Sequence, residues 1–220
     1  MTTAADTVRP GRPKSGQKAQ AILYAAGELF LSNGYQGTSM DAVAQRAGVS
    51  KQTVYSHFAN KEELFKACIR GKVAGYGFDG TASDEHGDLR DALSSIARQF
   101  VELMFDPEVI AMHRVVMAEA ASQPRIAELF FDSGPKRTKA AVCEFLQRQV
   151  EAGRLQISPD RLLYAAVQLL NTAAGMYQLS LWLGLQHPVD RTELDAHLER
   201  VVDDFLALYG VGATTVDASV

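Results

Sequence analysis

A short stretch of this chain carries six polar side chains and no acidic one, although an exposed helix face usually mixes in Asp or Glu. The six residues are Lys51, Gln52, Thr53, Tyr55, Ser56 and His57. Side chains of these types donate hydrogen bonds to phosphate oxygens and to base edges, and no carboxylate in the stretch repels a phosphate. The chemistry that the set favours is recognition of double-stranded DNA.

The net charge of −4 conceals two parts of opposite sign. Residues 1–72 contain 10 Lys or Arg against 5 Asp or Glu, a net charge of +5, whereas residues 73–220 contain 12 against 21, a net charge of −9. A basic N-terminal part joined to an acidic remainder indicates a polyanionic partner for the N-terminal part alone. Charge by itself leaves a second interpretation open, in which the excess basic groups only solvate a surface.

Two short helices around a glycine turn are predicted to present the six polar side chains. Thr38 and Asp41 have the spacing of a capping box that opens the first short helix, and Gly48 ends it. Ser50 is an N-cap for a second short helix through Phe58. The major groove is about 12 Å wide and accepts one helix when a partner helix braces it. The pattern therefore predicts a helix-turn-helix.

The same region resembles the DNA-binding domain of the tetracycline-repressor (TetR) family of bacterial transcription regulators. The matching pieces are AAGELF at 25–30, NGY at 33–35, TSM at 38–40, AGVSK at 47–51, VYSHF at 54–58 and NKEELF at 60–65. So many pieces at fixed spacing are a more specific signal than a lone helix-turn-helix pattern. The resemblance covers residues 18–66 and fades after that.

The resemblance implies roles for the residues of the second short helix. Lys51, Gln52 and Thr53 would lie nearest the base edges, and Tyr55 and His57 would contact backbone phosphates. Gln52 departs from the family pattern, in which a small residue or Gly is common, and this departure affects which bases are read.

Five further residues are candidate phosphate or groove contacts. The resemblance implies that Thr38, Ser39 and Lys61 anchor phosphates at helix N-termini, where free N–H groups favour anions. Capping alone is an equal alternative for Thr38 and Ser39. In the N-terminal arm, Arg12 and Lys14 are expected to reach a narrow minor groove, with solvated disorder as the alternative.

The whole chain is predicted to be all-α, with about nine helices. Residues 1–17 are expected to form a flexible basic arm, residues 18–72 the helix-turn-helix DNA-binding domain, residues 73–210 a helical effector-binding and dimerisation domain, and residues 211–220 a frayed tail. Helices are expected at about 88–105, 107–121, 124–133, 135–152, 159–186 and 192–209, with several starts marked by proline. This larger domain resembles the C-terminal domain of AefR-like regulators.

An effector site in the larger domain needs apolar walls and a few convergent polar groups. The candidates are Phe100, Met104, Met112, His113, Val116, Met117, Asn171, Tyr177, Gln178 and Trp182. For each residue taken singly, packing in the core or in an interface is the alternative. His113 is the most specific candidate, because a histidine on an apolar face can also bond a ligand.

The last two helices carry apolar stripes that exceed what one core needs. Ala173, Ala174 and Gly175 are small enough to allow close approach of another helix. The sequence therefore predicts a homodimer built on a four-helix interface, as the family resemblance also implies.

The sequence lacks the motifs that would indicate another class of protein. There is no phosphate loop, nucleophile elbow, HExxH or dinucleotide fingerprint, so an enzyme is not expected, nor is a cofactor. His187 and His197 do not have metal-ligand spacing, and Cys68 and Cys143 are interpreted as buried apolar groups.

No apolar run is long enough to cross a membrane, and no secretory signal precedes the first helix, so a cytoplasmic protein is expected. A purely architectural DNA binder would not need the large acidic domain. The sequence thus predicts a ligand-responsive, sequence-specific transcriptional regulator that binds a palindromic operator as a dimer. A small, largely apolar effector is expected to release it, and repression is expected as the family's commonest mode.

Overall fold

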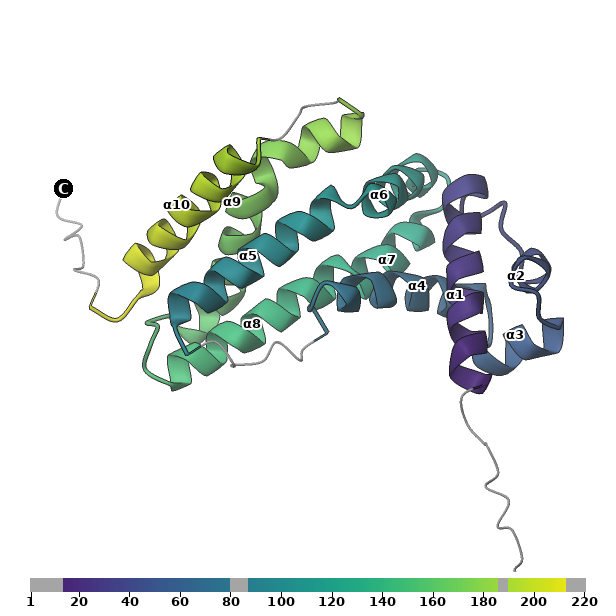
Figure 1. Cartoon of the computed structure of the whole chain (residues 1–220), viewed down its shortest axis with the longest axis horizontal. Helices are drawn as coiled ribbons and strands as arrows, with labels where there is room; N and C mark the ends of the chain where they lie inside the picture. The colour runs from purple at the N-terminus through teal and green to yellow at the C-terminus, as the bar shows by residue number, and fades with distance from the viewer. Residues whose placement is uncertain (1–13, 80–86, 186–189, 213–220) are drawn as a thin grey trace, which may run out of the picture. The chain divides into compact units, whose positions relative to one another are not determined.

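The computed structural model describes residues 14–79, 87–185 and 190–212, and these residues form ten α-helices and one short 3-10 helix (Figure 1). The all-α architecture with about nine helices is confirmed. The chain divides into two compact units, residues 1–68 and residues 69–220.

The first unit contains α1 (Lys14–Asn33), α2 (Met40–Arg46), α3 (Lys51–His57) and the start of α4 (Lys61–Gly75). Phe30 and Phe65 pack edge to face with ring centroids 5.1 Å apart, and Tyr35 contacts both rings. The apolar side chains of this unit that are almost fully enclosed include Ile22, Phe30, Val43, Val54, Leu64 and Phe65. This small core fixes α2 and α3 against α1 and α4.

The first helix begins earlier than the sequence pattern indicated. Residues 14–17 are helical, whereas the sequence predicted a flexible arm there. A single glycine, Gly16, costs a helix only about 1 kcal/mol, and this is too little to end it when the rest of α1 packs well. The remainder of the predicted arm, with Arg12, lies outside the described residues, as does most of the predicted tail.

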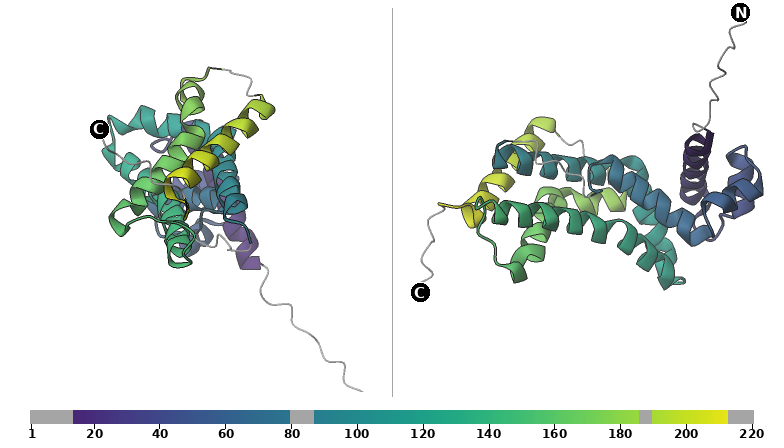
Figure 2. Two further views of the ribbon diagram at one scale, coloured as in Figure 1. Left: turned by 90° about the vertical axis from the view of Figure 1, so that its left-hand side faces the viewer. Right: turned by 90° about the horizontal axis from the view of Figure 1, so that it is seen from below.

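The second unit contains the end of α4 and seven further helical segments. They are α5 (Leu89–Phe105), α6 (Pro107–Ala120), α7 (Pro124–Ser133), α8 (Pro135–Glu151), η1 (Pro159–Arg161), α9 (Leu162–Leu183) and α10 (Arg191–Tyr209). Helix α9 packs against α5, α8 and α10, and α6 packs against α7 and α9 (Figure 2). The core of this unit includes Leu93, Phe145, Leu146, Leu169 and Phe205.

Proline and glycine set most of the helix boundaries in the second unit, as the sequence predicted. Pro107, Pro124 and Pro135 each occupy the first turn of a helix, where a missing N–H costs nothing. The predicted helix at 159–186 differs at both ends. It opens with a 3-10 turn, and it stops at Leu183 because Gly184 adopts a left-handed φ of 79°.

Candidate nucleic-acid interface

Two serine caps and one glycine build the turn between α2 and α3. The hydroxyl of Ser39 accepts a hydrogen bond from the N–H of Ala42, and that of Ser50 accepts one from the N–H of Thr53, both at 3.1 Å. Gly48 has a φ of 65°, a conformation that costs glycine little. The helix-turn-helix geometry expected from the sequence is therefore present.

Thr38 does not cap α2, so the predicted capping box with Asp41 was wrong. Thr38 is only 2% exposed, and its hydroxyl donates to the carbonyl oxygen of Gly34 at 2.7 Å. Ser39 is exposed and takes the cap position instead. A phosphate would therefore meet Ser39 and the free N–H groups of α2 before it met the Thr38 side chain.

The outer face of α3 presents four of the six polar residues identified from the sequence. Lys51, Gln52, Tyr55 and Ser56 are exposed, and their spacing places them on one side of the helix. Val54, on the opposite side, is fully buried. Helix α3 therefore has a polar outer face and an apolar inner one, as a groove-binding helix requires.

Thr53 and His57 are half-buried and lie at the edge of that face. The Thr53 hydroxyl is 2.8 Å from the Ser50 hydroxyl, so it belongs to the cap of α3. The His57 ring packs beside Phe58, with centroids 6.3 Å apart. The structure thus separates four exposed residues from two that are half-buried and partly committed to the fold.

An acidic neighbour of Lys51 was not predicted. The Lys51 ammonium lies 2.8 Å from the carboxylate of Asp41 in α2, and the hydrogen bond and charge of Asp41 raise the pKa of Lys51. Sequence reasoning found no carboxylate because it considered α3 alone. Only the packing of α2 against α3 brings Asp41 to Lys51.

Lys61 is held by the first unit rather than left free at the start of α4. Its ammonium donates to the carbonyl oxygen of Tyr35 at 2.8 Å and lies 4.4 Å from the centroid of the Tyr35 ring. A DNA phosphate that bound Lys61 would have to compete with the Tyr35 carbonyl oxygen and ring for its ammonium. For Lys14 the structure describes only the backbone, which is in the first turn of α1.

A bidentate ion pair ties α1 to α2. Nε and Nη2 of Arg46 each donate to one carboxylate oxygen of Glu28 at 3.0 Å, and this hydrogen bonding lowers the pKa of Glu28. The sequence offered no local signal for this pair, because its members are 18 positions apart. The pair helps to hold the brace helix α2 in a fixed orientation.

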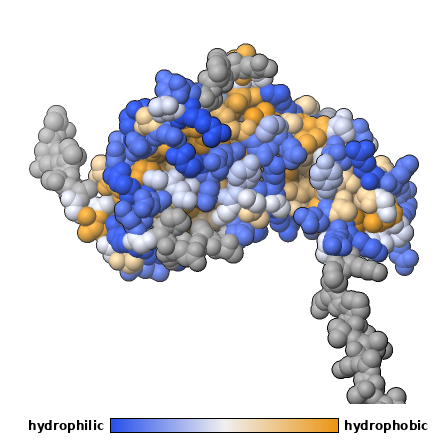
Figure 3. Space-filling view, in the orientation of Figure 1, coloured by the Kyte–Doolittle hydropathy of each residue, from blue (hydrophilic) through white to orange (hydrophobic). Residues whose placement is uncertain are grey.

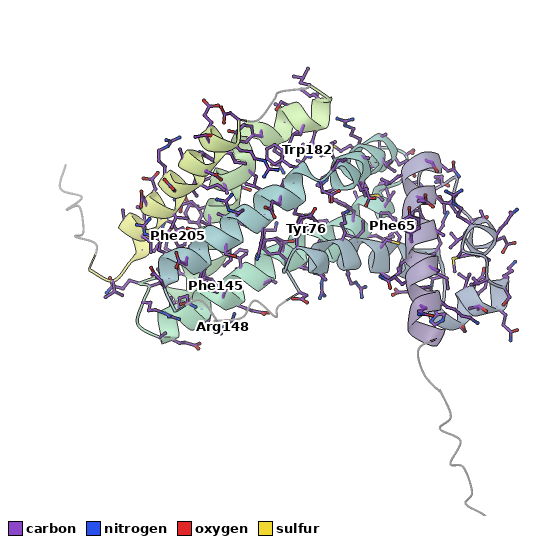
Figure 4. The ribbon with its side chains drawn as sticks, viewed as in Figure 1. Phe65, Tyr76, Phe145, Arg148, Trp182 and Phe205 are labelled. Atoms are coloured by element: carbon purple, nitrogen blue, oxygen red, sulfur yellow. The ribbon has the colours of Figure 1, made fainter. Side chains whose placement is uncertain are left out.

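Seven of the ten candidate effector residues lie in or beside three contacts of the second unit. The Gln178 amide nitrogen is 3.6 Å from the Met104 sulfur, and Tyr177 packs against Phe105. The His113 ring stacks on Trp182, with centroids 5.2 Å apart, and Trp182 is found near the end of α9 in Figure 4. Buried on the same face of α6 are Met112 and Val116.

The structure does not bring the other candidates to this group. Asn171 is exposed, and Met117 is 49% exposed on α6. Phe100 instead packs edge to face with Phe78. All ten candidates lie on α5, α6 and α9, but only seven of them lie in or beside the three contacts.

An ion-pair network joins the end of α4 to the start of α6, and sequence reasoning did not identify it. Lys72 lies 2.8 Å from Asp106 and 2.7 Å from Glu108, and the Tyr76 hydroxyl donates to Asp106 at 2.7 Å. Asp106 also caps α6. Partial burial acts to raise the pKa of Asp106, but the bonds from Lys72 and Tyr76 outweigh it and keep the pKa below its usual value.

Among the described residues, no group of three His, Cys, Asp or Glu side chains is arranged to hold a metal ion. In the same ranges, no helix has both the length and the apolarity to cross a membrane. Both cysteines are free and half-buried, and burial raises the pKa of Cys68 to about 12.

Comparison with protein families gives two matches that together cover most of the chain. Residues 22–68 match the profile of bacterial regulatory proteins of the tetR family. Residues 91–211 match the profile of the AefR-like transcriptional repressor C-terminal domain. The first match contains α2 and α3, and the second contains α6 and α9.

Individual proteins that are similar to this chain are also regulators. The HTH-type transcriptional activator FasR of Mycolicibacterium smegmatis is 29% identical over 205 residues, which cover 82% of this chain and 88% of that protein. The structure of the flavonoid-responsive regulator FrrA is 31% identical, covers 89% of this chain and 98% of its own, and has a TM-score of 0.70. A TetR-family regulator structure from Mesorhizobium loti is 28% identical, covers 91% of this chain and 100% of its own, and has a TM-score of 0.73.

Proposed function

The chain belongs to the TetR family of transcriptional regulators, with a helix-turn-helix DNA-binding domain and an AefR-like C-terminal domain, and on that premise we propose how it works. It binds a palindromic operator as a homodimer, and a small, largely apolar effector releases it. The observation that carries the proposal is the exposed polar face of α3 in the first unit. The second unit adds a separate group of aromatic side chains. The proteins similar to it are regulators and not enzymes.

In this proposal, the outer face of α3 enters the major groove. Lys51 and Gln52 meet base edges, and Tyr55, Ser56 and Ser39 meet the backbone. Thr53 and His57 lie at the edge of the DNA-contacting face of α3, while Thr38 stabilises the turn before α2. The site of action is then the cytoplasm, where bacterial DNA lies.

The proposed dimer uses the unpartnered face of α9 together with α10. Tyr164, Gly175 and Leu179 are exposed on one side of α9, and Leu208 is 61% exposed on α10. A Cβ added at Gly175 would meet no atom, so this position leaves room for a second helix. Figure 3 shows hydrophobic surface near the end of α9 on the face in view. Ala173 and Ala174, also predicted for helix approach, are buried within the chain's own core.

Release requires that the effector favour a conformation that DNA does not. Helix α4 begins in the DNA-binding unit and ends at the network of Lys72, Tyr76 and Asp106, and the label of Tyr76 in Figure 4 marks that end. A ligand that moves α6 would therefore move the end of α4. The flavonoid-responsive relative is a precedent for a small-molecule response in a similar chain. Repression fits the AefR-like match, although FasR is an activator.

The test is reciprocity between effector and operator. An effector found by thermal-shift screening should weaken operator binding about 5- to 150-fold, and operator DNA should weaken effector binding by the same factor. Calorimetry on the free and DNA-bound protein measures both. Equal effector affinity for the two forms would exclude induction by that ligand.

A further inference from the structure

We infer that the effector is an uncharged planar aromatic compound with a hydroxyl group, and that it binds at His113, Gln178 and Trp182, here called the α6–α9 cluster. This inference rests on the proposed function and adds the chemical class of the ligand. The cluster combines aromatic rings with two polar side chains, His113 and Gln178, that have hydrogen-bonding capacity left for a ligand. It offers no cationic side chain that is free to pair with a carboxylate ligand.

The first polar group is the outer nitrogen of His113. Nδ1 lies 2.8 Å from the carbonyl oxygen of Val109, and because a carbonyl only accepts, Nδ1 carries the hydrogen. Burial lowers the pKa of His113, more than the bond to Val109 raises it, so the ring is neutral at neutral pH. Nε2 is then an acceptor, and no group in the described ranges donates to it. A hydroxyl can donate to Nε2, whereas a carboxylate or an ether cannot.

Two aromatic rings pack against the imidazole of His113. Trp182 stacks on the imidazole with an interplanar angle of 27°, and Phe130 of α7 meets it edge to face at 4.9 Å between centroids. Flat π-systems stack favourably on such rings, and an aliphatic chain gains only contact area there. The rings therefore favour a planar ligand over a flexible one.

Gln178 supplies the second polar group. It lies one helical turn before Trp182 on α9 and is half-buried. Its one described partner is the sulfur of Met104 at 3.6 Å, which is a weak acceptor. An amide placed among apolar side chains with so weak a bond has donor and acceptor capacity left for a polar substituent of a ligand.

Arg114, the cation that bonds the backbone of Trp182, is committed to the fold. Nε and Nη2 of Arg114 donate to the carbonyl oxygens of Trp182 and Leu181 at 3.0 and 2.6 Å, where they satisfy the end of α9. A carboxylate ligand would have to compete with these bonds, so an uncharged ligand is preferred. Because Arg114 and His113 are neighbours on α6, a ligand at the cluster would act on α6 and α9 together.

Binding is tested with 2-naphthol, its methyl ether 2-methoxynaphthalene, 2-naphthoate and palmitate, by calorimetry on the full chain. We expect 2-naphthol to bind about tenfold more tightly than the ether, the effect of one hydrogen bond, and more tightly than either acid. Trp182 is the sole tryptophan, so a change in its fluorescence places the ligand at the cluster. Equal affinity for naphthol and its ether, tighter binding of an acid, or no binding would overturn the inference.

Two variants locate the hydroxyl preference. His113→Phe keeps an aromatic ring but removes the acceptor, so the tenfold preference should vanish while 2-methoxynaphthalene still binds. His197→Phe removes another half-buried histidine of the same unit, one that bonds Thr172, and should keep the preference. A preference that survives in His113→Phe contradicts the assignment.

Operator binding, measured by fluorescence anisotropy, distinguishes failure of the proposed function from failure of the inferred ligand class. If the operator is bound and palmitate releases it while 2-naphthol does not, the proposed function stands and the aromatic class is wrong. If no operator is bound, the proposed function fails whatever the ligand data show.

Discussion

The ammonium of Lys51 lies 2.8 Å from a carboxylate that the protein itself supplies, so a phosphate or base edge must compete with Asp41 for it. Both side chains are exposed, and water and salt weaken their attraction. The exchange of partners is therefore easy. Lys51 can be held in position on the free protein and still be available to DNA.

Lys51→Ala and Tyr55→Ala should each weaken DNA binding about 5- to 150-fold, because each removes a contact from the exposed face of α3. Anisotropy titration at fixed salt measures the loss, and circular dichroism should show unchanged helicity. Lys136→Ala is the matched control, since Lys136 is an exposed lysine paired with Asp132 at 2.9 Å in the other unit. An equal loss in the control would refute a special role for α3.

The stability of the second unit should depend on His113 in mild acid. Because burial lowers its pKa in the folded protein, the unfolded chain binds the proton more readily, and stability is lost as pH falls through about 6.5. His113→Phe cannot take up the proton, so its melting temperature should fall less between about pH 7.5 and pH 5. Identical pH dependence in the two proteins would contradict the assignment of this group.

At the residue scale, the sequence indicated which polar side chains lie on the outer face of α3, but it did not indicate their partners within the protein. The caps at Ser50 and the exposure of Gln52 follow from local spacing. The pairs of Lys51 with Asp41 and of Arg46 with Glu28 depend on packing between helices, which no local pattern encodes.

Among the helices, the junction of α4 and α6 is the connection that the proposed mechanism uses. Asp106 accepts bonds from Lys72 and Tyr76 and at the same time caps α6 through the N–H groups of Glu108 and Val109. The Asp106 side chain is 12% exposed, so this pair is less screened than the surface pairs. The two helices are therefore expected to move together.

Asp106→Asn should loosen the end of α4 without removing the cap, since asparagine also caps helices. Amide exchange in residues 70–76, followed by mass spectrometry, is expected to become roughly fivefold faster, because one partly buried ion pair is lost. Glu108→Gln is the control, because Glu108 contacts the same lysine but is 65% exposed. Unchanged exchange in Asp106→Asn would show that this pair does not hold α4.

Helix boundaries were predictable where proline or glycine marks them and unreliable where capping residues are adjacent. Pro107 and Pro135 begin helices as expected, whereas Thr38 and Ser39 compete for one cap and packing decides between them. Thr38 turns inward to bond Gly34, which leaves Ser39 to cap α2.

For the whole molecule, the division of charge and the division of structure fall at nearly the same place. The basic residues 1–72 contain the helix-turn-helix, and the compact units meet at residues 68 and 69. The all-α class and the family were predictable, because helical periodicity and spaced motifs are local signals. The α6–α9 cluster was only partly predictable, since it joins His113 and Trp182 from distant parts of the chain.

The central claim is that this protein reads a two-fold symmetric DNA sequence with two copies of α3. Selection from a pool of random duplexes with the purified full chain tests it most directly. We predict enrichment of a palindrome whose half-sites lie about 10 base pairs apart or a multiple of that, with two chains per site in sedimentation. Enrichment of no sequence, or of a single site without two-fold symmetry, would contradict the account.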